Sequence, residues 1–254
     1  MPKIFRLIIS EVDFRLVKLQ QLHAAACILL DDNDTHHETR KEWAIGPLRG
    51  DEQKRLAVMT IRTLSNKAEA HLVSRARQGA HIILGNQEGI VVQPAEKLEE
   101  TTWETLATPQ AQPPRSWVID CLSPTALSSH RKYTPLLDPS SIIGSLSRRW
   151  ESLHGRVGDS EFGLPRLTEE ELSHVWVSAI AGRTVTEVIP HFSATATDEK
   201  VFPGFVGRLM LKCDHPIVAA AVDCYLRFAR YAGIGALTTH GMGTIQLISR
   251  EGTH

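Results

Sequence analysis

The stretch that decides the fold class runs from Pro216 to Ser249 and reads PIVAAAVDCYLRFARYAGIGALTTHGMGTIQLIS. Its first part predicts a helix, with Pro216 near the start and a glycine just past the end, as helix termini prefer. Its last residues, GTIQLIS, predict a strand. The turn between them holds four glycines, Gly233, Gly235, Gly241 and Gly243. A dinucleotide or Walker loop is disfavoured, because those motifs follow a strand and open a helix.

Upstream, each half of the chain gives the same order of elements. In the first half we expect a strand, a helix, two strands, a helix and a hairpin, in KIFRLII, FRLVKLQQLHAAACILL, EWAIGPL, RLAVMTIRTL, SNKAEAHLVSRARQG and AHIILGNQEGIVVQP. In the second half, SWVIDCLS, RTVTEVIPHF and FVGRLMLKC predict strands, whereas SIIGSLSRRWESL and TEEELSHVWVSAI predict helices. Two βαββαβ halves predict an α+β protein with two tandem ferredoxin-like domains.

The boundary between the halves is indicated by a change of composition from Glu96 to Arg115. This region ends in ATPQAQPPR, and proline restricts both its own backbone and the residue before it, so we expect a semi-stiff linker. The predicted domains are residues 1–112 and residues 113–254. In the hairpin before the linker, we expect Asn86 and Gly89 to lie in the turn.

The composition disfavours several classes of protein. The 254 residues are 42% hydrophobic and carry a net charge of -1, so only a local basic face would attract a polyanion. The N-terminus has acids where a signal peptide needs an apolar core, and no apolar run is long enough to span a bilayer. We expect a cytoplasmic protein without a membrane segment. Reduced thiols are expected for the four widely spaced cysteines, Cys27, Cys121, Cys213 and Cys224.

The glycine-rich turn suits the backbone of a nucleic acid. A helix cap and a bulged turn explain only part of the glycine content, and bare amides can approach phosphates closely. Hydroxyl groups and an imidazole add donors, and two arginines precede the turn on one helical face. The candidate RNA-binding residues are Gly233, Gly235, Thr238, Thr239, His240, Gly241, Gly243, Arg227 and Arg230.

RFARYAGIGALTTHGMGTI, preceded by FPGFVGRLML, resembles the C-terminal signature of the CRISPR-associated endoribonucleases that cut precursor CRISPR RNA within its repeats. LSPT at Leu122–Thr125 and WAIGPL at Trp43–Leu48 are similar to further stretches of that family. The family belongs to the RAMP superfamily, whose members have ferredoxin-like domains and a glycine-rich loop near the C-terminus. The resemblance implies CRISPR repeat RNA as partner, a CRISPR effector complex or a homodimer as assembly, and no cofactor.

The resemblance also implies metal-independent cleavage. A ribose 2′-hydroxyl attacks the adjacent phosphorus and leaves a 2′,3′-cyclic phosphate and a 5′-hydroxyl. This chemistry needs a base, an acid and a cation near the phosphate, and histidine suits either proton role. The sequence contains neither an H-E-x-x-H motif nor a clustered carboxylate pattern, so we expect no metal site.

By resemblance, the catalytic histidine lies at the end of the first helical region, shortly before a strand like WAIGPL. His36 and His37 stand there, with His37 as first choice, although spacing does not separate the two. Simple solvation is the other explanation for two histidines in a polar loop. Arg40 and Lys41 follow and would stabilise charge on the phosphate. His23, within the first predicted helix, is expected to be structural.

The tyrosines depart from the family pattern. Some members pair the histidine with a tyrosine and a lysine, whereas Tyr133, Tyr225 and Tyr231 all lie in the second half of this chain. The candidate helpers are therefore Lys18, Arg40 and Lys41.

Two alternatives to an endoribonuclease stay open. One is a non-catalytic RNA-binding RAMP subunit of a CRISPR effector complex. The other is a ferredoxin-like protein that binds a small metabolite, which leaves the arginines without a role.

Overall fold

A computed structural model describes residues 1–32, 41–129, 132–157, 163–192 and 197–249. The chain forms two compact units. The first unit comprises Met1–Trp103 and Leu237–Met242, and the second comprises Glu104–Ala236 and Gly243–His254. The main division therefore falls nine residues before the predicted one at residue 112, and the middle of the glycine-rich turn belongs to the first unit.

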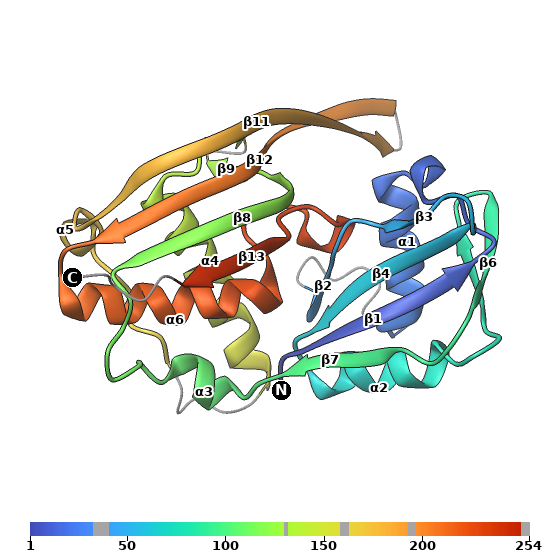
Figure 1. Ribbon diagram of the computed structural model, residues 1–254, viewed down its shortest axis with the longest axis horizontal. Helices are drawn as coiled ribbons and strands as arrows, with labels where there is room; N and C mark the ends of the chain where they lie inside the picture. The colour runs from blue at the N-terminus through green and yellow to red at the C-terminus, as the bar shows by residue number, and fades with distance from the viewer. Residues whose placement is uncertain (33–40, 130–131, 158–162, 193–196, 250–254) are drawn as a thin grey trace. The chain divides into compact units, whose positions relative to one another are not determined.

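The first unit is built on one antiparallel sheet (Figure 1). Its strands lie in the order β2-β4-β1-β6-β5, with β3 paired to β4 and β7 paired to β1. The bounds are β1 Lys3–Ser10, β2 Trp43–Ile45, β3 Arg49–Asp51, β4 Leu56–Thr63, β5 His81–Leu84, β6 Gln87–Val91 and β7 Glu96–Glu100. Because β1 lies between β4 and the strands at the end of the unit, and β2 is next to β4, this is the ferredoxin-like arrangement.

Two helices pack on this sheet, α1 (Leu19–Leu30) and α2 (Asn66–Arg75). The buried residues of α1 recur three and four positions apart, which forms one apolar stripe along the helix. Alternate residues of β1 point into the same core, as the period of a strand requires. The residues that meet there include Phe5, Leu7, Ile9, Leu22, Ala25, Ala26 and Leu29.

The first helix is shorter than the sequence predicted. The stretch that begins at Phe14 forms a separate 3-10 turn, η1 (Phe14–Leu16), and α1 begins only at Leu19. The Asp13 carboxylate accepts hydrogen bonds from the backbone N–H and the guanidinium of Arg15. Such a local bond between side chain and backbone competes with a continuous helix.

The expected hairpin is present, but its turn differs from the prediction. Gly85 and Asn86 form the turn, whereas Gly89 lies within β6. A Cβ at Gly89 would approach the side chains of Ile9 and Val12 to 2.4 and 2.6 Å. Gly89 is therefore needed for close packing rather than for the turn.

The sequence predicted a linker from Glu96 to Arg115, but only part of this region lacks regular structure. Residues Glu96–Glu100 form β7 against β1, and α3 spans Trp103–Ala107. The guanidinium of Arg6, on β1, donates to the Glu96 carboxylate with an Nε–Oε2 distance of 3.0 Å. Opposite charges on paired strands thus stabilise a strand that its acidic composition alone does not predict.

The second unit also contains an antiparallel sheet, in the order β11-β12-β8-β13. It is covered by α4 and α6, in the chain order β8, α4, β11, β12, α6, β13. This is again the ferredoxin-like arrangement, so the predicted tandem fold is confirmed. The bounds are β8 Ser116–Thr125, α4 Pro139–Val157, α5 Glu169–Leu172, β11 Val175–Phe192, β12 Thr197–Cys213, α6 Pro216–Ala232, η2 Thr238–His240 and β13 Ile245–Ser249, with β9 Leu127–Ser129 and β10 Lys132–Thr134 forming a separate hairpin.

One predicted helix of the second half is mostly strand. Only Glu169–Leu172 is helical, where Thr168 and Glu171 form a capping box, and β11 begins at Val175. From there the β-branched and aromatic residues pair with β12, for example Trp176 with Lys212. The predicted helix is thus present only as a single turn.

Within the described ranges, no helix has the length and the apolar composition that crossing a membrane requires.

Candidate functional site

The predicted catalytic residues His36, His37 and Arg40 lie outside the described residues. The chain is described up to Asp32 and again from Lys41, and both ends belong to the first unit. Side-chain contacts hold both of these described ends.

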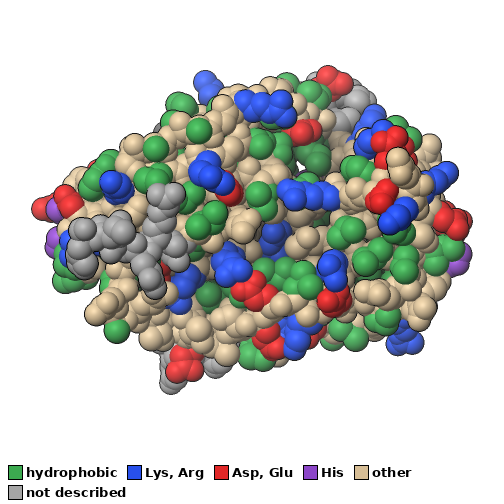
Figure 2. All heavy atoms as spheres, viewed as in Figure 1, with side chains coloured by type: hydrophobic (Ala, Val, Ile, Leu, Met, Phe, Trp, Pro, Cys, Tyr) green, Lys and Arg blue, Asp and Glu red, His purple; other side chains and the backbone are tan. Residues whose placement is uncertain are grey.

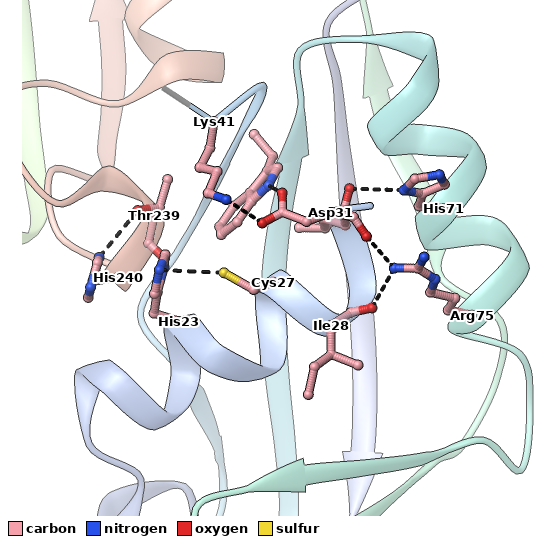
Figure 3. Close-up of polar contacts among 11 residues, drawn as sticks. His23, Cys27, Ile28, Asp31, Lys41, His71, Arg75, Thr239 and His240 are labelled. Atoms are coloured by element: carbon pink, nitrogen blue, oxygen red, sulfur yellow. Dashed lines mark hydrogen bonds and ion pairs between the residues drawn. The ribbon is translucent and has the colours of Figure 1, made fainter. Parts of the chain in front are cut away.

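A buried ion pair joins the two ends (Figure 3). Lys41 Nζ lies 2.6 Å from Asp31 Oδ2, and the side chains of Lys41 and Asp31 are 7% and 6% exposed. The other carboxylate oxygen, Oδ1, accepts a hydrogen bond of 2.7 Å from Trp43 Nε1. Buried charges are stable only when they are paired and hydrogen-bonded. The ammonium of Lys41, a predicted helper, therefore links the end of α1 to the start of β2.

The last turn of α1 is capped by side chains of α2. Arg75 Nη1 donates to the carbonyl oxygens of Ile28 at 2.6 Å and Asp31 at 2.7 Å. His71 Nδ1 lies 3.2 Å from the carbonyl oxygen of Leu30. The last carbonyls of a helix have no partner within it, so these contacts satisfy them and complement the negative end of the helix dipole.

Asp32, the last described residue before the segment, also contacts α2. Its Oδ1 lies 2.8 Å from His71 Nε2, and its Oδ2 pairs with Lys67. The hydrogen bond from Lys67 lowers the pKa of Asp32 below its ordinary value, so the carboxylate stays charged at neutral pH. The chain that leaves α1 toward residue 33 is thus held through both aspartates.

The glycine-rich turn has a backbone that requires glycine. The φ angles are +75° at Gly233, +83° at Gly235, +94° at Gly241 and +67° at Gly243. At Gly235 there is also no space, because a Cβ would lie 2.2 Å from the carbonyl oxygen of Ala126. Conformation and packing therefore explain these glycines without a ligand.

Several N–H groups of the turn donate within the second unit. Ile234 N donates to the carbonyl of Gly243 at 2.9 Å, Ala236 N to that of Ala126 at 2.8 Å, and Gly243 N to that of Pro124 at 2.9 Å. These amides stabilise the turn itself. RNA contact by the turn remains a prediction.

The middle of the turn, η2, packs on α1 through His23 (Figure 3). His23 Nδ1 lies 2.9 Å from the carbonyl oxygen of Thr239, and His23 Nε2 lies 3.4 Å from Cys27 Sγ. The rings of His23 and His240 are stacked, with centroids 3.9 Å apart and planes 5° apart. Burial, and then the proximity of His23, lower the pKa of His240 to about 3, so this ring is neutral at neutral pH.

Arg227, a predicted RNA contact, is bound within the second unit. Its Nε lies 2.8 Å from Asp223 Oδ2, and its Nη1 and Nη2 donate to the carbonyls of Thr105 at 2.6 Å and Thr108 at 2.8 Å. Arg227 therefore holds the end of α3 against α6. Arg230, three residues on, is exposed. RNA contact by the two arginines remains a prediction.

Basic and acidic side chains are interspersed on the face in Figure 2, as the near-zero net charge suggests.

Within the part of the chain that the structure describes, no group of three or more His, Cys, Asp or Glu residues is placed to hold a metal ion.

The sequence did not indicate the contacts of His23 and Asp31. His23 was expected to be structural, and its partner Thr239 lies 216 positions away. Asp31 and Trp43 lie on either side of a polar stretch of sequence, which gives no sign that they meet. Only the contact between His23 and Cys27 follows from local spacing, because the two residues are four positions apart on a helix. Their importance depends on contacts that the fold creates.

Two units with ferredoxin-like strand order, and a glycine-rich turn before the last strand, define a tandem ferredoxin-like protein of the kind that the resemblance implied. The sequence model of one family, CRISPR-associated endoribonuclease Cas6, matches residues 119–245, half of the chain. The chain therefore belongs to the Cas6 family.

Solved structures agree with this assignment at the level of the fold. A Cas6 (TTHA0078) product complex is similar with 23% identity and a TM-score of 0.72, covering 98% of this chain and 99% of that chain. A Cas6 (TTHA0078) H37A mutant is similar with 22% identity and a TM-score of 0.70, covering 98% of this chain and 99% of that chain. Cas6 (TTHB231) from Thermus thermophilus is similar with 19% identity and a TM-score of 0.62, covering 98% of each chain. No curated protein matches the chain in a sequence comparison.

Proposed function

We propose that this chain is an endoribonuclease that cleaves CRISPR repeat RNA without a metal ion. Membership of the Cas6 family is the observation that carries the proposal. The similar TTHA0078 protein was solved as a product complex and as a histidine-to-alanine mutant, which supports a search for the catalytic group among the histidines of this chain.

In the proposed reaction, a base removes the proton of a ribose 2′-hydroxyl, and the oxygen attacks the adjacent phosphorus. The bond from phosphorus to the 5′-oxygen breaks, and an acid protonates the leaving oxygen. The products are a 2′,3′-cyclic phosphate and a 5′-hydroxyl. A positioned histidine contributes about 10²- to 10⁴-fold to such proton transfers.

We assign the proton transfer to His37, with His36 as the alternative, and the cation at the phosphate to Arg40. The ion pair between Asp31 and Lys41 supports a different role for Lys41. Its ammonium fixes the second end of the catalytic segment instead of contacting RNA, and electrostatic stabilisation of the transition state needs such preorganisation.

For RNA binding we propose the glycine-rich turn and the exposed Arg230. Thr238 and Thr239 bring hydroxyl groups, which suit the ribose and phosphate groups of a single strand. His240 would act as a neutral group, because its pKa lies at about 3. Assembly with a CRISPR effector complex or as a homodimer, and location in the cytoplasm, stay predictions.

The test is cleavage of a CRISPR repeat RNA in EDTA, with a matched RNA that carries a 2′-deoxy group at the cut site. We expect the first RNA to be cut and the second to stay intact. Loss of cutting in EDTA, or cutting of the deoxy RNA, would refute the mechanism.

Single variants then assign the histidine. We expect His37→Ala to lower the single-turnover rate by at least about 100-fold, as loss of a general acid or base does. His81→Ala is the matched control, because this exposed histidine pairs with Glu88 on a hairpin of the first unit. If both His36→Ala and His37→Ala bind and cut like the parent, the assignment fails. Tight binding without cutting by the parent would favour the non-catalytic RNA-binding subunit.

A further inference from the structure

The contact between α1 and η2 fixes the tautomer of His23. A carbonyl oxygen only accepts hydrogen bonds, so His23 Nδ1, 2.9 Å from the Thr239 oxygen, carries the proton. In the neutral ring Nε2 is then an acceptor, and it faces Cys27 Sγ at 3.4 Å. Burial raises the pKa of Cys27 to about 12, so its thiol keeps the proton it can donate. Both ring nitrogens thus have suitable partners.

The faces of the ring are used as well. One contact is the parallel stack with His240, with centroids 3.9 Å apart. Another is a tilted contact with Trp43, with centroids 5.7 Å apart. Thr239 Oγ1 lies 3.2 Å from His240 Nδ1, so the two residues of η2 that contact His23 also contact each other. The imidazole of His23 therefore contacts η2 through an edge and a face.

The backbone of η2 does not hold this conformation by itself. Its single turn has the bonds from His240 N and Met242 N to the Leu237 carbonyl, at 2.8 and 3.3 Å. Leu237 has a φ of +57°, which is unfavourable for a branched side chain, and Gly241 has a φ of +94°. One 3-10 turn with left-handed residues at both ends needs tertiary contacts to persist.

We infer that His23 is a positioning residue that sets the conformation of the Thr238–Gly241 turn, and through it the affinity of this turn for RNA. The second part rests on the proposed function. The hydrogen bond fixes the peptide after Thr239, and the stack fixes the ring of His240. His23 acts through these residues and takes no part in the proton transfers.

Three variants separate the two contacts. His23→Asn keeps an N–H donor near the position of Nδ1 but removes the stack. His23→Phe keeps a ring against His240 but removes the donor. His23→Ala removes both. His71→Ala is the matched control, since His71 also lies on a helix of the first unit and contacts a backbone carbonyl, that of Leu30, but belongs to α2 and contacts Asp32.

The first readout is amide hydrogen exchange of residues 237–242, which does not depend on RNA. We expect exchange in this segment to be about tenfold faster in His23→Ala, as the loss of about 1.4 kcal/mol of local stability gives. The Asn and Phe variants should lie between this variant and the parent, and His71→Ala should match the parent in this segment. Unchanged exchange in His23→Ala overturns the inference. If His23→Ala does not fold, the Asn and Phe variants decide in the same way.

The second readout is the affinity for the repeat RNA and the rate of its cleavage. We expect His23→Ala to raise the Kd for the repeat RNA about tenfold, while the single-turnover rate at saturating RNA stays within about twofold of the parent. His23→Asn should recover part of the affinity. Faster exchange with unchanged RNA affinity overturns the link between the turn and RNA. If the parent neither binds nor cuts RNA, the proposed function fails, and hydrogen exchange still decides the positioning role.

Discussion

Replacing Asp31 by alanine tests the buried ion pair that joins the end of α1 to the residue before β2. The Asp31 carboxylate is 6% exposed and accepts from Lys41 Nζ at 2.6 Å, and its other oxygen accepts from Trp43 Nε1 at 2.7 Å. The variant removes the Asp31 carboxylate, which is a counter-ion of the buried Lys41 ammonium and an acceptor of the Trp43 indole N–H. Breaking a buried pair by removing one partner costs about 3–5 kcal/mol. This corresponds to roughly two to four orders of magnitude in the folding equilibrium constant.

The assay is urea unfolding with linear extrapolation, in which the midpoint should fall and the slope should stay constant. Asp32→Ala is the matched control, because Asp32 is the next residue and also forms ion pairs, but its side chain is 31% exposed. We expect a much smaller loss there, since exposed pairs are screened by water. Asp31→Asn should lie between the two, because the amide keeps an acceptor for Trp43. An Asp31→Ala loss below about 1 kcal/mol would refute the reasoning, since it would fall in the range of an exposed pair.

The remaining predictions concern the turn and α6. Folding lowers the pKa of His240 from 6.5 to about 3. The neutral ring therefore contributes fully to the free energy of unfolding above pH 6.5, and this contribution declines by about 1.4 kcal/mol per pH unit as the pH falls from 6.5 toward 3. Urea unfolding at pH 7 and pH 5 should show this decline, and His240→Phe should reduce it. Gly235→Ala should destabilise by at least about 2 kcal/mol more than Gly79→Ala, measured by urea unfolding, because only Gly235 lacks space. Arg227→Ala should cost about 3 kcal/mol in the same assay, since it leaves the buried Asp223 carboxylate without its cation.

The controls for these predictions lie within the same protein. Gly79 has a φ of +79°, close to the +83° of Gly235, but nothing lies within 4 Å of its Cβ position. Equal losses for the two alanine variants would contradict the packing argument. For Arg227, the exposed Arg230 on the same helix is the comparison, and an equal loss of stability for Arg230→Ala would contradict the role of burial. A stability difference between pH 7 and pH 5 that is unchanged in His240→Phe would contradict the assignment to that ring.

The sequence by itself determined the two βαββαβ patterns, although it did not indicate β7, α3 or the start of β11. The apolar spacing of α1, the alternation of β1 and β4, and the sequence from helix to glycine turn to strand at the end of the chain are local patterns. A local pattern is sufficient because the period of a helix or strand is set by neighbouring residues. The family resemblance lay in the same continuous stretches, and it was confirmed by the match over residues 119–245.

Only the tertiary structure decided which residues meet. The acidic β7 is a strand because β1 supplies Arg6 and Lys3 opposite its glutamates. Asp31 and Lys41 meet because the end of α1 lies beside the residues that lead into β2, and His23 meets a turn 216 positions away. Such contacts join residues that share no period and no neighbourhood in the chain. Their energy comes from pairing and burial in the folded units, which no window of sequence contains.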